Sequence, residues 1–198
     1  MDVLYFVEDA AHETFMRALV TRAAAHFGCD SGAWHHDVRI SHGKGRTLRD
    51  MRLFLRDIVS GELVSPDLLI LTVDGDCEAN ATRQRVDELV EQTGYIGPLL
   101  LAVPDPHIER WYMSDPEALR VVSGSTILPP LPAIRCRKDL FKNSLRQVFV
   151  NAGINPPLGG TEYGDEIVAR MDVFRARQND SSLDRFFNDA QAAFVTLG

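Results

Sequence analysis

The sequence predicts an α/β fold: an open, mainly parallel sheet with flanking helices, followed by a C-terminal helical extension. Strand-like and helical segments alternate through about residue 122, the order typical of parallel sheets with right-handed crossovers. The stretch from Asp67 to Val73 carries a continuous apolar run, which indicates burial on both faces. Beyond Pro129 the patterns are helical. We therefore expect an α/β domain over residues 1–128 and a helical extension over 129–198.

The first half of the α/β domain is justified element by element. Residues 2–7 form an apolar run that ends at Glu8, as expected for a buried strand. Apolar side chains four residues apart predict the next helix, and Gly28 predicts its end. A short strand over 36–41 then precedes a helix for which Thr47 is the predicted cap.

The remaining elements follow by the same criteria. After the buried strand over 67–73, apolar periodicity predicts a helix over 80–92. Gly97–Pro98 introduces a fourth strand, over 99–103. Ser114–Glu117 combines a cap, an early proline and a glutamate, which predicts a helix start. The extension is predicted to hold helices over 139–152, 165–177 and 182–197.

The composition is that of an ordinary globular chain. Of 198 residues, 45% are apolar and 25% charged, which excludes a disordered or collagenous chain. No apolar stretch reaches the roughly 18 residues of a membrane helix, and no basic-then-apolar leader opens the chain. We expect a cytoplasmic protein that makes no membrane contact. Cys29, Cys77 and Cys136 show no short pairing pattern, so neither a disulfide framework nor a cysteine zinc site is expected.

The charge is unevenly distributed along the chain. A net charge of −7 argues against a generally basic nucleic-acid coat protein. However, residues 44–57 hold five basic and two acidic side chains, whereas residues 74–91 hold six acidic and two basic ones. Acidic residues beside basic stretches suit a metal–phosphate site better than a uniform surface field.

Carboxylates stand at the ends of two predicted strands. Glu8 ends the first strand, and Asp74 and Asp76 end the third. Because ligands of open α/β sheets bind beyond the carboxyl ends of the strands, these groups can meet there. Clustered hard oxygen ligands favour Mg²⁺ or Mn²⁺, and a nearby Glu8 could act as general acid or base. Alternatively, such acidic residues only cap the next helix or face solvent.

Basic residues near the second helix are candidates for phosphate binding. Lys44 lies between Gly43 and Gly45, so it can reach the crevice as a point charge on phosphate, although the pattern is not a P-loop. Arg46 begins a series at helical spacing. That series either lines a phosphate-backbone groove or forms a solvated outer face. Its members are Arg46, Arg49, Arg52 and Arg56.

Other candidate residues have plain structural alternatives. The histidines lack the spacing of a helical zinc site, so a transition-metal role is not favoured for His35, His36, His42 and His107. Trp111 and Tyr112 can stack on a base, but core packing is the favoured role. Glu109 either completes the acidic pocket or forms a surface ion pair with Arg110 or Arg46.

The residues around the two acidic strand ends resemble a known family. A strand, Glu8, a turn and a helix, followed later by Val73-Asp74-Gly75-Asp76, resemble the TOPRIM domain of topoisomerases, primases and OLD-type nucleases. This resemblance covers about residues 2–105. The stretches 43–45 and 107–115 resemble TOPRIM-related bacterial proteins of antiphage-defence or mobile-element loci.

This resemblance implies a TOPRIM/Rossmann-like fold and a Mg²⁺- or Mn²⁺-dependent nuclease that cuts DNA or RNA. It implies Glu8 as general acid or base and metal ligand, Asp74 and Asp76 as metal ligands, and Glu109 as a further acidic site residue. Lys44 and Arg46 are the expected substrate-binding residues. An ATPase partner and a homo-oligomer are the interactions that it implies.

Two positions depart from the TOPRIM pattern. Asp9 stands where the pattern has glycine, and His12 stands where it often has an acidic residue. These departures favour an alternative: a catalytically degenerate interaction module that docks on an ATPase or another effector. A small-molecule phosphotransferase has the least support. A nuclease requires divalent metal at Asp74 and Asp76, whereas a docking module does not.

Overall fold

The fold is built on a four-stranded parallel sheet, confirming the predicted α/β class. The computed structural model describes residues 1–131, 133, 136–137 and 139–197. Its strands lie in the order β2-β1-β3-β4. Their bounds are Asp2–Val7 (β1), His35–Ile40 (β2), Leu68–Thr72 (β3) and Leu99–Ala102 (β4). The chain moves from β1 outward to β2 and then crosses back to β3, so the topological switch point lies between β1 and β3.

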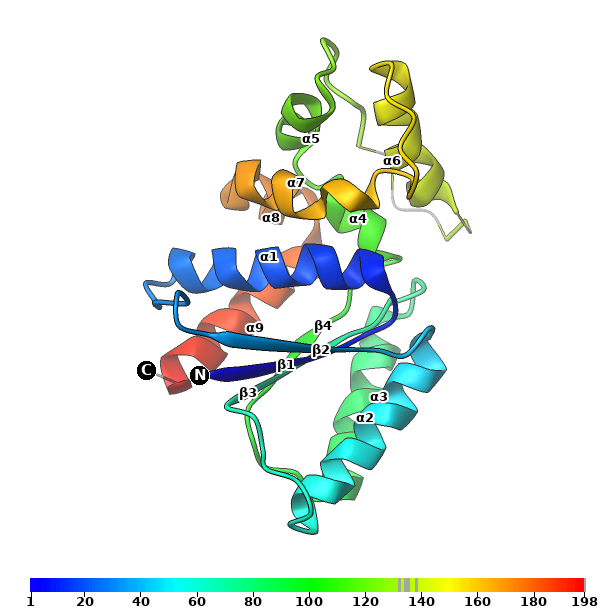
Figure 1. Cartoon of the computed structure of the whole chain (residues 1–198). Helices are drawn as coiled ribbons and strands as arrows, with labels where there is room; N and C mark the ends of the chain where they lie inside the picture. Colours follow the sequence, from blue (N-terminus) through cyan, green and yellow to red (C-terminus); the bar gives the residue numbers. More distant parts are fainter. Residues whose placement is uncertain (132, 134–135, 138, 198) are drawn as a thin grey trace.

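Helices cover both faces of the sheet (Figure 1). One face is covered by α1 (Ala10–His26) and α9 (Ser181–Leu197), and the other by α2 (Lys44–Val59) and α3 (Ala79–Thr93). Alternate side chains of β1 point to opposite faces: Tyr5 packs in the core under α1, and Phe6 packs in the core against α2. The sheet is therefore a middle layer between two layers of helices.

The remaining helices form a group on the α1 side of the sheet (Figure 1). Their bounds are Ile108–Tyr112 (α4), Pro116–Ser123 (α5), Leu140–Asn151 (α6), Gly164–Arg170 (α7) and Val173–Asn179 (α8), with a 3₁₀ turn over Thr161–Tyr163. Their apolar side chains share one cluster with α1, α9 and one face of the sheet. The predicted domain boundary after residue 128 lies between α5 and α6.

One predicted helix is wrong, because residues 165–177 do not form a single element. The chain is extended at Met171, between α7 and α8. Asp172 then caps α8 by accepting the Arg175 N–H at 3.0 Å. The Asp115 carboxylate accepts the Asp172 N–H at 2.7 Å and also binds the Arg175 guanidinium. A buried partner far away in the sequence therefore fixes the break.

Two predicted helix caps are also corrected. Helix α2 begins at Lys44, after Gly43, whose φ of 114° favours glycine. Thr47 lies inside this helix, where its hydroxyl donates to the Gly43 carbonyl at 3.1 Å. Helix α5 is capped by Asp115 rather than Ser114. The Asp115 carboxylate accepts the Glu117 N–H at 3.1 Å, whereas the Ser114 hydroxyl donates to the preceding Trp111 carbonyl.

A disulfide joins Cys77 to Cys136, contrary to the expectation that the cysteines would not pair. Cys77 follows β3 and Cys136 lies between α5 and α6, so the bond links segments 59 residues apart. The pair could not be predicted from the sequence, because the two cysteines are far apart along the chain and form no recognisable short motif. Cys29 is free.

Two further features bear on the predictions. Trp111 and Tyr112 are fully buried, which confirms core packing as their role. Within the part of the chain that the structure describes, none of the helices has the length and apolar character to cross a membrane.

Candidate functional site

The candidate site lies at the switch point of the sheet, where β1 and β3 end side by side. Val7 of β1 is in register with Thr72 of β3, so the residues that follow them emerge together. Glu8 directly follows Val7, Asp74 lies two residues after Thr72, and Glu8 Oε1 accepts the Asp74 N–H at 2.7 Å. The two predicted acidic residues are thereby brought together, at the edge where open α/β sheets bind ligands.

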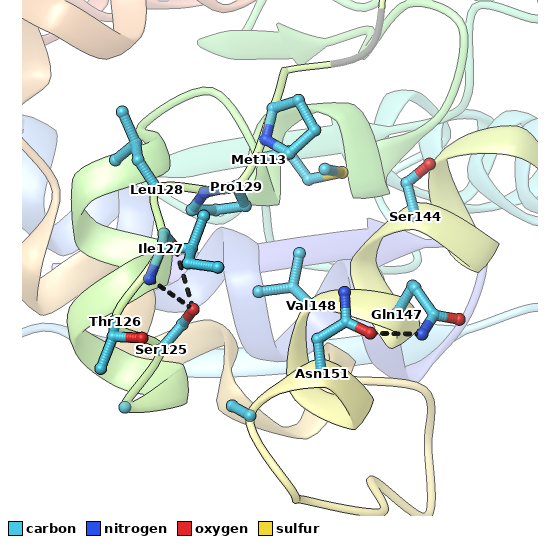
Figure 2. Close-up of a pocket in the computed structure, with 13 residues that line it drawn as sticks. Met113, Ser125, Thr126, Ile127, Leu128, Pro129, Ser144, Gln147, Val148 and Asn151 are labelled. Carbon is cyan, nitrogen blue, oxygen red and sulfur yellow. Dashed lines mark hydrogen bonds between the residues drawn. The ribbon is translucent and has the colours of Figure 1, made fainter.

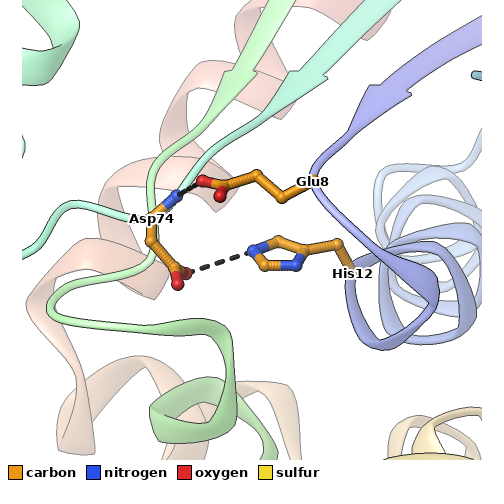
Figure 3. A group of neighbouring side chains, drawn as sticks. All are labelled: Glu8, His12 and Asp74. Carbon is orange, nitrogen blue, oxygen red and sulfur yellow. Dashed lines mark hydrogen bonds and ion pairs between the residues drawn. The ribbon is translucent and has the colours of Figure 1, made fainter. Parts of the chain in front are cut away.

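A histidine from α1 completes this cluster (Figure 3). Asp9 caps α1 by accepting the His12 N–H at 3.1 Å, which places the imidazole over the end of the sheet. His12 is 2% exposed. Its Nδ1 lies 2.8 Å from Asp9 Oδ1 and its Nε2 lies 3.1 Å from Asp74 Oδ1. Sequence reasoning noted His12 only as a departure from a pattern, yet its place in the first turn of the helix that follows Glu8 was a usable signal.

Glu8, His12 and Asp74 have the chemistry of a divalent-metal site. One ligand atom from each residue lies within 4.8 Å of the others. Two carboxylates and one imidazole fit Mn²⁺ or Mg²⁺, and the nitrogen donor favours Mn²⁺ over the all-oxygen preference of Mg²⁺. The donor set therefore fits the expected ion, with Mn²⁺ as the better candidate.

Asp74 is the most heavily bonded member of the cluster. Its Oδ1 also accepts the Ile108 N–H at 2.8 Å, and its Oδ2 lies 3.1 Å from His107 Nδ1. His107 follows β4 and precedes α4, so a third strand end contributes to the site. Although burial opposes its ionisation, hydrogen bonds from His107 and His12 lower the pKa of Asp74.

Asp76, the other predicted metal ligand, lies outside this three-residue cluster. Its side chain is 54% exposed and pairs with Lys44 Nζ at 3.0 Å, while His107 Nδ1 lies 3.6 Å away. The intervening Gly75 leaves no room for a side chain, because a Cβ at this position would lie 2.7 Å from the Asp105 carboxylate and 3.0 Å from a backbone carbonyl. The turn therefore separates the two carboxylates.

The other predicted site residues take different positions. Glu109, in the first turn of α4, lines a groove together with Asp9. Lys44, partly buried, reaches the rim of the site through Asp76. Arg46 is exposed at the start of α2. The structure thus brings Lys44 to the site and gives no contact that links Arg46 to it.

The protonation of these groups follows from their burial and neighbours. Burial opposes charge on the imidazole, but hydrogen bonds to Asp74 and Asp9 raise the pKa of His12 to about 10. Likewise, burial opposes ionisation of Asp9, yet its bonds with His12 lower its pKa to about 2. Burial raises the pKa of Glu8, and that of Glu109 for the same reason. Without a bound ion, the site thus holds an imidazolium between carboxylates, beside two carboxyls that retain protons more readily than usual. Because a metal binds only neutral imidazole, an ion held by His12 would displace a proton from the ring.

A second hollow, of about 470 Å³, lies between α5 and α6 (Figure 2). Its lining includes Ile127, Leu128, Pro129 and Val148, with Gln147 and Asn151 bonded to each other on α6. None of its lining residues that the structure describes is ionisable. The described groups suited to acid–base or metal chemistry are instead concentrated at the switch point.

Comparison of the chain with protein-family models, with curated proteins and with solved structures finds no match.

Proposed function

We propose that this protein is a divalent-metal-dependent phosphodiesterase of TOPRIM type that cuts DNA or RNA. The observation that carries the proposal is the meeting of Glu8, His12 and Asp74 within 4.8 Å at the switch point of a parallel sheet. The sequence resemblance to TOPRIM-related bacterial proteins supports bacterial antiphage defence as the setting, with an ATPase or a second copy of the chain as candidate partners.

Each residue has a role that its environment supports. Glu8, His12 and Asp74 would hold the ion, which when bound would polarise a phosphoryl oxygen and stabilise developing charge. Glu8, whose pKa is raised by burial, is suited to carry a proton to or from the reacting oxygen. Lys44 stands at the rim as a compact cation for a phosphate.

A second candidate function is favoured by a specific observation. Both oxygens of Asp74 already have partners within the chain: Oδ1 with His12 and Ile108, and Oδ2 with His107. A carboxylate with both oxygens hydrogen-bonded inside the chain can be stable without a metal ion, as expected for a cluster that only stabilises the fold. The protein would then be a catalytically degenerate module that docks on an ATPase or another effector.

Metal titration by calorimetry separates these two functions. We expect Mn²⁺ to bind the wild type, and the substitutions Asp74→Asn and Glu8→Gln to abolish or strongly weaken binding. Asp37→Asn is the matched control, because Asp37 is an exposed carboxylate on β2. Wild type and Asp37→Asn should bind equally. Absence of binding at millimolar Mn²⁺, or equal binding by Asp74→Asn, would contradict the phosphodiesterase and favour the docking module.

A further inference from the structure

A groove of about 560 Å³ borders the candidate site. Asp9 of the α1 cap and Glu109 of α4 line one part of it, and α6 lines another with Lys142 and Arg146. In Figure 1, α6 lies above the N-terminal end of α1. Asp9 directly follows Glu8, and Glu109 directly follows Ile108, whose N–H binds Asp74. The groove therefore borders the site through Asp9, which is bonded to His12.

The α6 wall presents two cations on one helical face. Lys142 and Arg146 are four residues apart, a spacing that aligns side chains along a helix with a rise of about 6 Å. Both are exposed. Within the described part of the chain, neither forms an ion pair. Two positive charges without an ion-pair partner among the described residues thus face the same groove.

Acidic residues of the groove are largely engaged elsewhere. Asp9 is bonded to His12 at 2.8 Å. Glu162 accepts the backbone N–H groups of Leu158 and Gly160, at 3.3 and 2.9 Å. These bonds hold two of the three carboxylates of the groove in place, and Glu109 is the third. An anion in the groove is therefore expected to contact the α6 side, where the two cations lie.

We propose that this groove binds a single nucleic-acid strand, with Lys142 and Arg146 contacting neighbouring phosphates. The guanidinium fork of Arg146 matches phosphate oxygens, and Lys142 supplies a point charge. The apolar atoms of Pro156, Pro157 and Leu158 offer a surface for sugars or bases. The volume lies within the roughly 300–1,000 Å³ of small-ligand pockets, which is room for part of one strand. Only one part of this inference rests on the proposed function, namely that the bound strand is cut at Glu8 and Asp74.

Strand binding can be measured separately from cleavage. Fluorescence anisotropy with a short labelled oligothymidylate in EDTA reports binding while metal-dependent cleavage is blocked. We expect the double substitution Lys142→Ala/Arg146→Ala to weaken binding at least tenfold. The slope of log K against log[salt] should fall in magnitude by about 1.4, because each single-strand phosphate contact contributes about 0.7.

The matched control removes two exposed arginines that lie outside the groove. Arg85 on α3 and Arg170 on α7 are exposed and do not line it, so Arg85→Ala/Arg170→Ala changes the net charge equally. It should leave affinity and salt slope close to wild type. The conservative change Lys142→Arg should retain binding, which shows that charge at this position matters. Thermal unfolding of each variant checks that it is folded.

Three results would overturn the inference: no binding by the wild type at low salt, equal weakening by both double variants, or equally tight competition by polyglutamate. The last result would assign the groove to an acidic protein segment. Failure of the hydrolysis proposal looks different. In that case Lys142→Ala/Arg146→Ala still weakens strand binding, but no metal binds and no nucleic acid is cut by the wild type.

Discussion

Replacing Cys77 by serine is expected to destabilise the protein by a predictable amount. The Cys77–Cys136 bond closes a loop of 59 residues between the turn after β3 and the segment before α6. For a loop of this size the chain-entropy relation gives about −14 cal/mol/K for the denatured state, or about 4 kcal/mol at 25 °C. The free energy of unfolding should fall by this amount in Cys77→Ser and in Cys136→Ser.

Urea unfolding followed by circular dichroism measures this loss. With a slope of about 2 kcal/mol/M, a loss of about 4 kcal/mol lowers the midpoint by about 2 M. Reducing the wild type with dithiothreitol should give the same shift, and reductant should not affect Cys77→Ser. Cys29→Ser is the control, because Cys29 is the free cysteine. The urea midpoint of this variant should match that of the wild type and should still fall when reductant is added.

Two results would refute this reasoning. The first is a thiol titration of unfolded, unreduced wild type that finds three free thiols, which would show that Cys77 and Cys136 are not bonded. The second is a Cys77→Ser midpoint that coincides with that of oxidised wild type. In that case the bond would not restrict the denatured chain as the loop length requires.

Three other predictions concern stability and the site. Burial opposes ionisation of Asp115, but its hydrogen bonds with Arg175 lower its pKa. The stabilisation of the fold by this carboxylate is therefore present above pH about 4 and is lost as pH falls through the folded-state pKa. Asp115→Asn should therefore cost about 1–3 kcal/mol at pH 7, and the difference from wild type should shrink below pH 4; a pH-independent difference in urea unfolding would contradict this. Gly75→Ala would place a Cβ 2.7 Å from the Asp105 carboxylate, so it should shift the turn and weaken Mn²⁺ binding in calorimetry, whereas unchanged binding would show that the turn adapts. Ser182→Ala removes a hydroxyl that bonds a backbone amide, an indole and a carboxylate, and should cost about 1–3 kcal/mol in thermal unfolding; an unchanged midpoint would contradict it.

The sequence was most informative where structure depends on local pattern. The apolar run over 67–73 predicted the central strand β3, and apolar side chains four residues apart predicted α1. Glu8 and Asp74 could be placed together because parallel strands share one carboxyl edge. These predictions needed only chain periodicity and the rule for where ligands bind in α/β folds.

The sequence alone determined the α/β class, the strand ends and the pair Glu8–Asp74. The tertiary structure decided that His12 joins this pair, that Asp76 turns to Lys44, and that distant Cys77 and Cys136 meet. It also decided the groove beside α6. The reason is physical: periodicity records which face of an element is buried, whereas contacts between side chains from distant segments depend on strand order, helix placement and the path of each turn.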